Sequence, residues 1–133
     1  MTTTTTTLQA VSVPAETALF GQPTKVFIDT GTHTALVASL TPGTGQFAQV
    51  ARLFYATLSY SAAPAVSVLT VKDGTTVIYQ AEISATGRFV YHFDFSAKPL
   101  RASAGAVLSV NVGDAGVGIV QTISCVGDLV AQS

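Results

Sequence analysis

The feature that most constrains this chain is a period of two in its hydrophobic pattern. In the segment RFVYHFDF, residues 88–95, aromatic side chains occupy every second position, at Phe89, Tyr91, Phe93 and Phe95. Alternate residues of an extended chain point to opposite faces, so these four rings share one face. Because aromatic rings bury large apolar areas, we expect this strand to lie over the core, with the intervening residues, His92 among them, outside.

The same period recurs along the chain and predicts β-strands. The clearest hairpin covers residues 66–84, where two alternating segments flank Asp73-Gly74, a pair that accepts the positive φ angles of a tight turn. Further strand candidates are LQAVSV (8–13), KVFI (25–28), TALVASL (34–40), VARLFYATLSY (50–60), AVLSVNV (106–112) and GIVQTISCV (118–126). No segment carries a helical stripe, and glycine and proline fall mostly between these candidates.

This succession of short strands predicts an all-β fold, an antiparallel β-sandwich of the jelly-roll type. We expect an extended threonine-rich N-terminal arm at residues 1–10 and a single sandwich domain at residues 11–133. The longer connections around residues 41–49 and 97–105 suit crossovers between two sheets. The order of the strands does not follow from the pattern, because strand pairing is non-local.

The scarcity of charge predicts an assembling protein. Only 10% of the 133 residues are charged, whereas 48% are hydrophobic. An average soluble domain has about 25% charged residues, so a single copy would be weakly protected against association. We therefore expect other copies or a larger assembly to cover much of the surface. The net charge of -1 and the scattered basic residues argue against a nucleic-acid partner.

The sequence also limits redox chemistry and membrane insertion. The sole cysteine, Cys125, excludes an intrachain disulfide and a cysteine-based zinc cluster. The N-terminus shows neither a basic n-region nor a continuous apolar h-region, and no apolar run approaches the roughly 18 residues that span a bilayer. We expect a protein made in a cytoplasm, with no membrane partner.

A tract of threonines opens the chain at residues 2–7 and is followed by Leu8. Such β-branched residues favour extended backbone, but the tract offers no apolar face that would dock on its own domain. A polar terminus of this kind becomes ordered when a partner pins it. We predict that the arm binds a partner through Thr2, Thr3, Thr4, Thr5, Thr6, Thr7 and Leu8.

The segment KVFIDTGTH, residues 25–33, raises the question of proteolysis. Its Asp29-Thr30-Gly31 is similar to the catalytic loop of retroviral-type aspartic proteases, in which two carboxylates about 3 Å apart share a proton. The Ser or Ala that usually follows the glycine is replaced by Thr32, and no glycine-rich flap hairpin follows. Because Asp, Thr and Gly are ordinary turn formers, we interpret the triplet as a turn after a strand.

No other group of residues predicts catalysis or a cofactor. His33 and His92 lie far apart without metal-ligand spacing, and the glycine segments lack the lysine that phosphate loops require. No nucleophile elbow is present. Cys125 alternates with Ile123 and Ile119, which predicts a buried small hydrophobe. We therefore predict no catalytic, cofactor-binding or metal-binding residue, and a protein that is not an enzyme.

Carbohydrate binding is the alternative from another functional class, because β-sandwiches often serve that purpose. Such sites stack sugars on exposed aromatic rings, above all tryptophan, and this chain has no tryptophan. Most of its phenylalanines and tyrosines occupy alternating core positions. Tyr55, Tyr60 and Tyr79 are the candidates for outward rings.

A series of short motifs follows from Val50 onward. A strand ending in Ser, Ala and Pro leads to a V-x-D-G hairpin at residues 70–74, and an aromatic strand follows. A Pro-Leu-Arg turn at residues 99–101, a G-x-x-L-x-V strand at residues 105–112 and a glycine-rich final hairpin complete the series. In this order the chain resembles small β-sandwich proteins from the structural gene blocks of tailed bacteriophages. The first fifty residues are not covered.

The resemblance implies a virion protein assembled in the host cytoplasm, and first of all a capsid decoration (cement) protein that stabilises the phage head. Its expected partners are the major capsid protein, or another virion protein, and copies of itself in a homotrimer. The arm would add backbone hydrogen bonds at an open sheet edge of a partner. A tail, fibre or neck component is the alternative within the structural class, because the fold alone does not decide the role.

Overall fold

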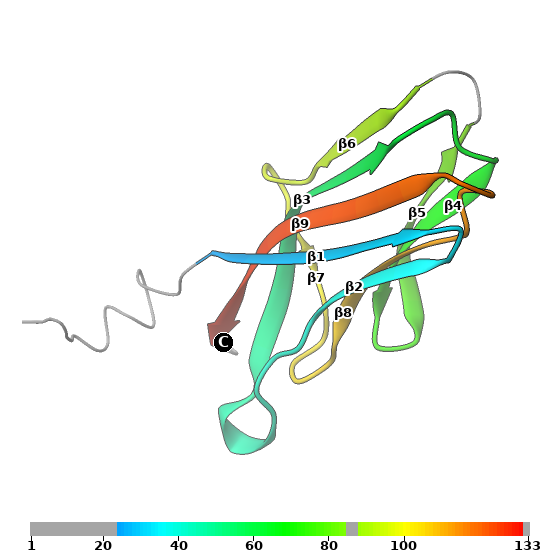
Figure 1. The fold of residues 1–133 in the computed structure, drawn as a ribbon. Helices are drawn as coiled ribbons and strands as arrows, with labels where there is room; N and C mark the ends of the chain where they lie inside the picture. The colour runs from blue at the N-terminus through cyan, green and yellow to red at the C-terminus, as the bar shows by residue number, and fades with distance from the viewer. Residues whose placement is uncertain (1–23, 85–87, 132–133) are drawn as a thin grey trace, which may run out of the picture.

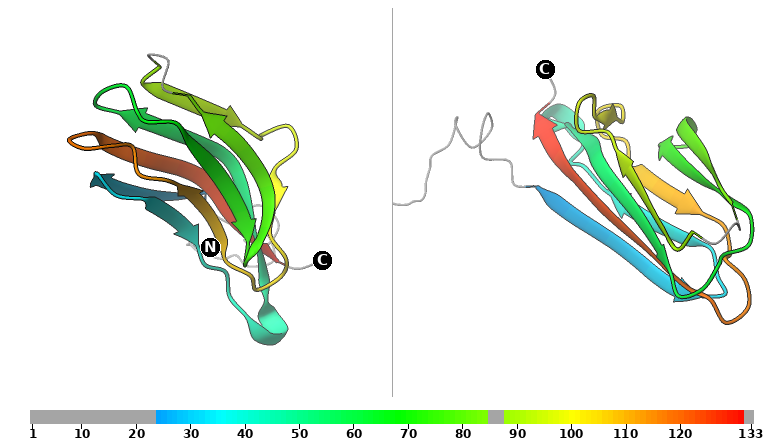
Figure 2. Two further views of the ribbon diagram at one scale, coloured as in Figure 1. Left: turned by 90° about the vertical axis from the view of Figure 1, so that its right-hand side faces the viewer. Right: turned by 90° about the horizontal axis from the view of Figure 1, so that it is seen from above.

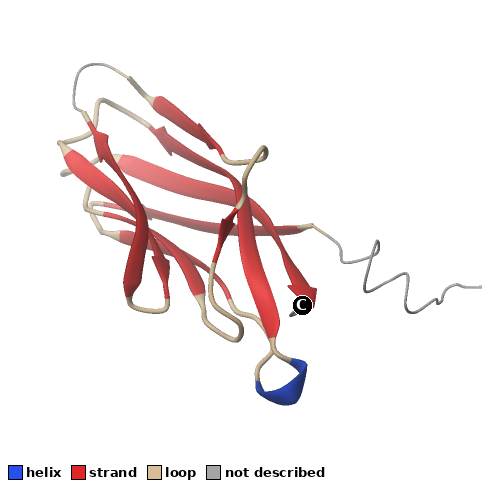
Figure 3. Cartoon of the chain, turned by 180° about the vertical axis from the view of Figure 1, so that it is seen from behind, coloured by secondary structure: helices blue, strands red, loops and turns tan. Residues whose placement is uncertain are grey.

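The computed structural model describes residues 24–84 and 88–131, which form two antiparallel sheets packed face to face (Figures 1 and 2). The predicted all-β sandwich is therefore confirmed. The arm at residues 1–10, with Thr2–Thr7 and Leu8, and the strand expected at residues 8–13 lie outside the described residues. Within them, one short 3-10 turn, η1 (Gly45–Phe47), is the only helical element (Figure 3). No helix there has the length and apolarity needed to cross a membrane.

The strands divide into the two sheets as follows. The first sheet contains β1 (Lys25–Thr32), β9 (Val120–Ala131), β3 (Gln49–Tyr60) and β6 (Val90–Asp94) in this order, with the short β7 (Leu100–Arg101) also on β3. The second sheet contains β2 (Leu36–Leu40), β8 (Leu108–Val112), β4 (Ser67–Asp73) and β5 (Thr76–Ile83) in this order.

The pairing pattern identifies a jelly roll. With β7 set aside, the first strand pairs with the last, β1 with β9, and the second with the second last, β2 with β8. The inner pairs are β3 with β6 and β4 with β5. This nested order is that of an antiparallel ribbon wrapped around one core. The connection at residues 41–49 crosses from β2 to β3, and that at residues 97–105 leads by way of β7 to β8, so both crossover predictions hold.

The core fills the space between the sheets with alternate residues of both. Leu53 and Ile123 of the first sheet and Leu69 and Val110 of the second are fully buried. Burial of each such side chain stabilises the fold by about 1.5–3 kcal/mol relative to exposure. Cys125 is fully buried as well, as its alternation predicted.

The aromatic strand lies over the core, but with one exception. Tyr91 is buried, and Phe93 and Phe95 pack partly against the core, whereas Phe89 remains 48% exposed. The reason is that β6 begins only at Val90, so Phe89 belongs to the preceding connection. Tyr79 of β5 meets the Phe95 ring edge-on, with 4.9 Å between centroids, and covers the core between the two sheets on this side.

The predicted hairpin is confirmed as β4–β5, but its turn is displaced by one residue. Asp73 pairs with Thr76, so the loop is Gly74-Thr75 and not Asp73-Gly74. Gly74 has φ 61° and supplies the positive φ that a two-residue hairpin loop needs at its first position. Asp73 stays in the ladder, where its carboxylate accepts a hydrogen bond of 2.7 Å from Ser103 Oγ.

The interpretation of Asp29-Thr30-Gly31 as a turn is wrong. These residues continue β1 as far as Thr32, and Asp29 pairs with Ile123 of β9. The chain turns only at His33, which adopts φ 52°. Asp29 fits in the strand because its carboxylate accepts the backbone N–H of Val37 in β2 at 3.0 Å. The apparent protease motif therefore joins the two sheets.

Candidate interaction surface

The outer face of the first sheet is the most distinctive surface of the described residues. Alternate residues of β1, β9, β3 and β6 point away from the core, and the strand register places them in rows. Most of them are β-branched or carry a hydroxyl group. The outer face, as the term is used below, consists of Val26, Ile28, Thr30, Thr32, Val120, Thr122, Ser124, Val126, Arg52, Asp128, Tyr55, Thr57, Ser59, Val90, His92 and Asp94.

Apolar side chains on this face are strongly exposed, above all along β1. Val26 is 63% and Ile28 58% exposed. In the register, Val26 lies beside Val126, which lies beside Tyr55, so an apolar row runs inward from the β1 edge. Contiguous exposed apolar side chains of this kind mark interaction surfaces more often than isolated ones do.

The outer face is almost without net charge because its main ions pair with each other. Arg52 donates from Nε to Asp128 Oδ1 at 2.8 Å and from Nη2 to Asp128 Oδ2 at 2.7 Å. The hydrogen bond to Asp128 raises the pKa of Arg52, although burial opposes it. Asp94 is the further carboxylate of this face, and hydrogen bonds from Ser96 lower its pKa.

Two rings stack on the outer face. The rings of Tyr55 and His92 lie 5.7 Å apart at an interplanar angle of 22°, and Thr57 Oγ1 is 2.8 Å from His92 Nδ1. His92 is thus outward, as the alternation predicted. A hydroxyl and an imidazole alone do not make a nucleophilic site, because the base also needs a group that orients it.

Of the three tyrosines considered for outward rings, only Tyr55 lies on the outer face. Tyr60 is 8% exposed, and Tyr79 packs against Phe95, so the expectation is wrong for these two. A β-bulge between Leu53 and Tyr55 changes the phase of β3, so that even-numbered residues face the core beyond it. Desolvation in the core raises the pKa of Tyr60 to about 12.

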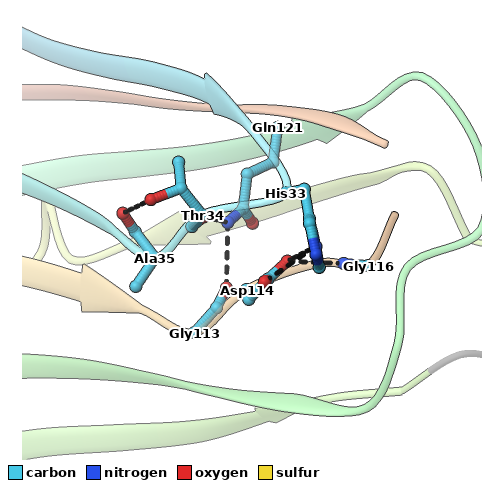
Figure 4. A network of polar contacts seen from close by, with 7 residues as sticks. All are labelled: His33, Thr34, Ala35, Gly113, Asp114, Gly116 and Gln121. Carbon is cyan, nitrogen blue, oxygen red and sulfur yellow. Dashed lines mark hydrogen bonds and ion pairs between the residues drawn. The ribbon is translucent and has the colours of Figure 1, made fainter. Parts of the chain in front are cut away.

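A polar network ties the loops together at one end of the sandwich (Figure 4). His33 Nδ1 lies 2.9 Å from Asp114 Oδ2, and both side chains are largely exposed. The buried Gln121 donates from Nε2 to the carbonyl oxygens of Thr34 at 2.9 Å and Gly113 at 2.8 Å. These bonds link the β1–β2 turn to the β8–β9 loop, which indicates a structural role.

No metal site accompanies this network. In residues 24–84 and 88–131, no group of three or more His, Cys, Asp and Glu side chains is arranged to hold a metal ion. His33 and His92 lie apart, one at the loop end and one on the outer face.

Sequence reasoning missed the Arg52–Asp128 pair and the apolar row. The two charges are 76 residues apart, and only the register of β3 on β9 brings them together. Neither a protein-family model nor a curated protein sequence matches this chain. The outer face itself and the resemblance of residues 50–133 are therefore the basis for a functional proposal.

Proposed function

We propose that this protein is a non-enzymatic structural component of a tailed-phage virion, and within that class a capsid decoration protein. The observation that carries the proposal is the outer face, which is nearly neutral and exposes Val26 and Ile28 beside rows of hydroxyl groups. Depletion of charge at the centre of a patch is typical of protein interfaces. The assignment to a virion rests on the resemblance to phage structural proteins, because the fold by itself does not indicate a function.

In this role the sandwich binds its partners through one side, the outer face. The outer face would dock on the major capsid protein or on another copy, and burial of Val26 and Ile28 would supply the apolar part of the contact. The arm at residues 1–10 would add a second contact. Many such contacts on one shell sum through multivalency, so each one alone can be weak.

The direct test is incorporation into particles by variants of the outer face. Ile28→Asp places a charge in the apolar row and is expected to abolish incorporation while the purified protein stays folded. Val77→Asp is the matched control, since Val77 is 49% exposed on β5 in the other sheet. Equal incorporation of both variants would contradict a role for the outer face.

The number of copies per particle separates the roles within the structural class. Hundreds of copies indicate the capsid shell, and a handful indicate the tail, fibre or neck. Quantitative mass spectrometry of purified particles measures this number, and absence of the protein from particles would refute the virion role.

Removal of residues 1–10 tests the arm, and sedimentation equilibrium tests the homotrimer. The truncated sandwich should fold but fail to enter particles, because the second contact is lost. A trimer needs two different complementary patches on each copy. A stable monomer or dimer at high concentration would refute the homotrimer but would not affect the proposed virion role.

Carbohydrate binding remains the second candidate, and the stacked rings of Tyr55 and His92 on the outer face favour it. Sugars stack on such exposed rings. A glycan array with full-length protein is the test: a signal that disappears in Tyr55→Ala and persists in Tyr79→Ala would support it. Silence of the array for the wild type would dismiss it.

A further inference from the structure

Strand β1 forms a long regular edge of the first sheet (Figure 1). Within the described residues it pairs with β9 on one side only, and the pairing from Lys25↔Gly127 to Thr32↔Val120 has no register shift. The other end strands are less suited to addition of a strand. β2 and β6 have five residues each, and β5 pairs with β4 through a bulge. A long unbroken edge is the part of a sheet at which another strand pairs most readily.

The hydrogen bonds show which backbone groups of β1 point toward the open side. Thr30 donates its N–H to Asp29 Oδ1 at 3.0 Å. The Thr30 and Thr122 hydroxyls are 2.9 Å apart, which suits the closer, non-hydrogen-bonded type of cross-strand pair. His33 donates its N–H to Ile119 O of the β8–β9 loop. The backbone N–H and C=O groups of the odd-numbered residues of β1 therefore point toward β9. Those of Val26 and Ile28 point in the opposite direction, toward the open side of the strand.

The side chains along this edge are self-complementary. Val26 and Ile28 lie on the outer face and are the two most exposed large hydrophobic residues of β1. Lys25, Phe27 and Asp29 lie on the opposite face, with Lys25 and Asp29 at equal distances from Phe27 along the strand. Reversal of the strand about Phe27 exchanges the lysine with the aspartate.

From this arrangement we infer that β1 pairs with β1 of a second copy, antiparallel, with Phe27 opposite Phe27 of that copy. Val26 then forms backbone hydrogen bonds with Ile28 of the second copy, twice by symmetry, and their side chains make one apolar cluster. Lys25 comes to lie opposite Asp29 of the second copy, also twice. The Asp29 carboxylate already accepts two backbone N–H groups and keeps lone pairs for an ammonium group.

The two registers next to it in the C-terminal direction, centred on Ile28 and on Asp29, fit less well. Only registers that place even-numbered residues opposite one another align the outward backbone groups. With Ile28 at the centre, Phe27 would oppose the Asp29 carboxylate, and Thr30 would have to give up its bond to Asp29. With Asp29 at the centre, two carboxylates would face each other, and like charges in that position are destabilising.

The inference deepens the proposed role in assembly, on which it rests, by naming the partner at one margin of the outer face. The contact is two-fold, because the same strand serves both copies. It therefore predicts a dimer of the free protein and departs from the homotrimer expected from the resemblance. The two outer faces would form one continuous surface across the dimer.

Val26→Pro tests the backbone contact. Proline removes the outward N–H of Val26 but leaves the ladder to β9 intact, and its φ suits an edge strand. Sedimentation equilibrium of the full chain should show a dimer for the wild type and a dissociation constant at least about tenfold higher for the variant. Val26→Thr keeps the N–H and the β-branching, so it should remain largely dimeric.

Lys25→Glu tests the register. It places a carboxylate opposite Asp29 of the second copy in two symmetric pairs, which should weaken the dimer about tenfold at low salt and less at high salt. Lys98→Glu is the matched control, because Lys98 is exposed in the β6–β7 turn and makes the same change of net charge. Equal weakening by both variants would contradict the register.

Amide exchange gives the sharpest single observation. Concentration-dependent protection should appear at Val26 and Ile28 but not change at Thr30, whose N–H is bonded to Asp29 already. A wild type that stays monomeric at millimolar concentration, or a dimer that Val26→Pro leaves unchanged, overturns the inference. Neither result bears on the presence of the protein in particles, so failure of the edge contact and failure of the virion role are distinguishable.

Discussion

Strand β9 pairs with β3 on one side and with β1 on the other, and the two seams are built differently. The β9–β3 seam runs from Gln49↔Ala131 to Tyr60↔Gln121 and contains a bulge. It also contains Gly127, which lies against the backbone of Arg52, and the Arg52–Asp128 ion pair. The β9–β1 seam is shorter and regular, and its polar side-chain contact is the Thr30–Thr122 hydroxyl pair.

The difference shows that one sheet contains both a seam with a fixed strand register and an edge suited to pairing with another strand. The bulge and the ion pair of the β9–β3 seam fit a single register, because a slip by one residue would turn every side chain to the other face. The β9–β1 seam carries fewer such devices, and the far side of β1 has its backbone groups directed outward. The interior seam therefore stabilises the fold, whereas the edge is suited to contact with another chain.

The largest effect is expected from the group that lies between the two seams. Cys125 of β9 pairs with Phe27 on one side and Ala56 on the other, and desolvation raises the pKa of its thiol from 9.0 to about 12. The thiol has a higher pKa in the folded than in the unfolded state. The contribution of the buried neutral thiol to the stability of the fold is therefore complete below pH 9 and is lost as the pH rises toward 12. The free energy of unfolding should fall by about 4 kcal/mol over that interval.

Urea unfolding of the wild type and of Cys125→Ala between pH 8 and pH 12 measures this loss. The variant starts from a lower stability because it lacks the thiol, but its slope with pH should be shallower. Tyrosine and lysine residues titrate in both proteins and cancel in the comparison. Equal slopes would mean that the thiol stays protonated over this pH range, or that its ionised form does not destabilise the core.

The two glycines that lie in these seams allow a matched test of packing. A Cβ atom at Gly127 would overlap the carbonyl oxygen of Arg52 in β3, and this backbone atom cannot move without distortion of the seam. Gly127→Ala should therefore destabilise the protein by about 3 kcal/mol. At Gly31 of β1, the Cβ would meet the ends of two side chains, Thr34 Cγ2 at 2.6 Å and Leu36 Cδ2 at 3.2 Å. Thr34 is exposed and can rotate, and the Leu36 methyl group needs to move by only a few tenths of an ångström.

Gly31→Ala should accordingly cost about 1 kcal/mol or less. Thermal melts of both variants measure the contrast. Equal destabilisation would show that the side chains around Gly31 yield no more readily than the backbone of β3 beside Gly127.

Loss of the ion pair in the interior seam should have the next largest effect. Asp128→Ala leaves the Arg52 guanidinium without its bidentate partner, although 30% of that side chain is exposed and solvent compensates in part. We expect a loss of about 2 kcal/mol. Denaturant midpoints at low and high salt measure it, with Thr122→Ala in the other seam as control at about 0.5 kcal/mol. A smaller loss for Asp128→Ala than for the control would contradict the comparison.

A smaller effect than that of the ion pair is expected where β1 meets β2 in the other sheet. Asp29→Ala removes the acceptor of the Val37 N–H and should cost about 1 kcal/mol, since both groups are exposed to water. Amide exchange should accelerate at Val37 and Thr30 and stay unchanged at Ile123. Unchanged exchange at Val37 would mean that Asp29 does not cap the β2 edge.

Several elements of the fold and of the surface were predictable because they depend on neighbours in sequence. The period of two predicted the strands, and a burial side followed for Cys125 and His92. The hairpin followed from turn chemistry, although Gly74 displaced the loop by one residue. Locally, Asp29-Thr30-Gly31 favours a turn, but a carboxylate bonded to a neighbouring strand suits β1 equally well. Propensity alone does not distinguish these outcomes.

By itself, the sequence determined that this chain forms short strands with one buried and one exposed face, because alternation is read from adjacent residues. Tertiary structure alone decided the order of the strands, the bulge that turns Tyr60 inward and the pairing of Arg52 with Asp128. It also decided that β1, with Val26 and Ile28, is an end strand of its sheet among the described residues. The physical reason is that backbone hydrogen bonds between strands join residues far apart in the chain, so register and edges exist only once the sheets have assembled.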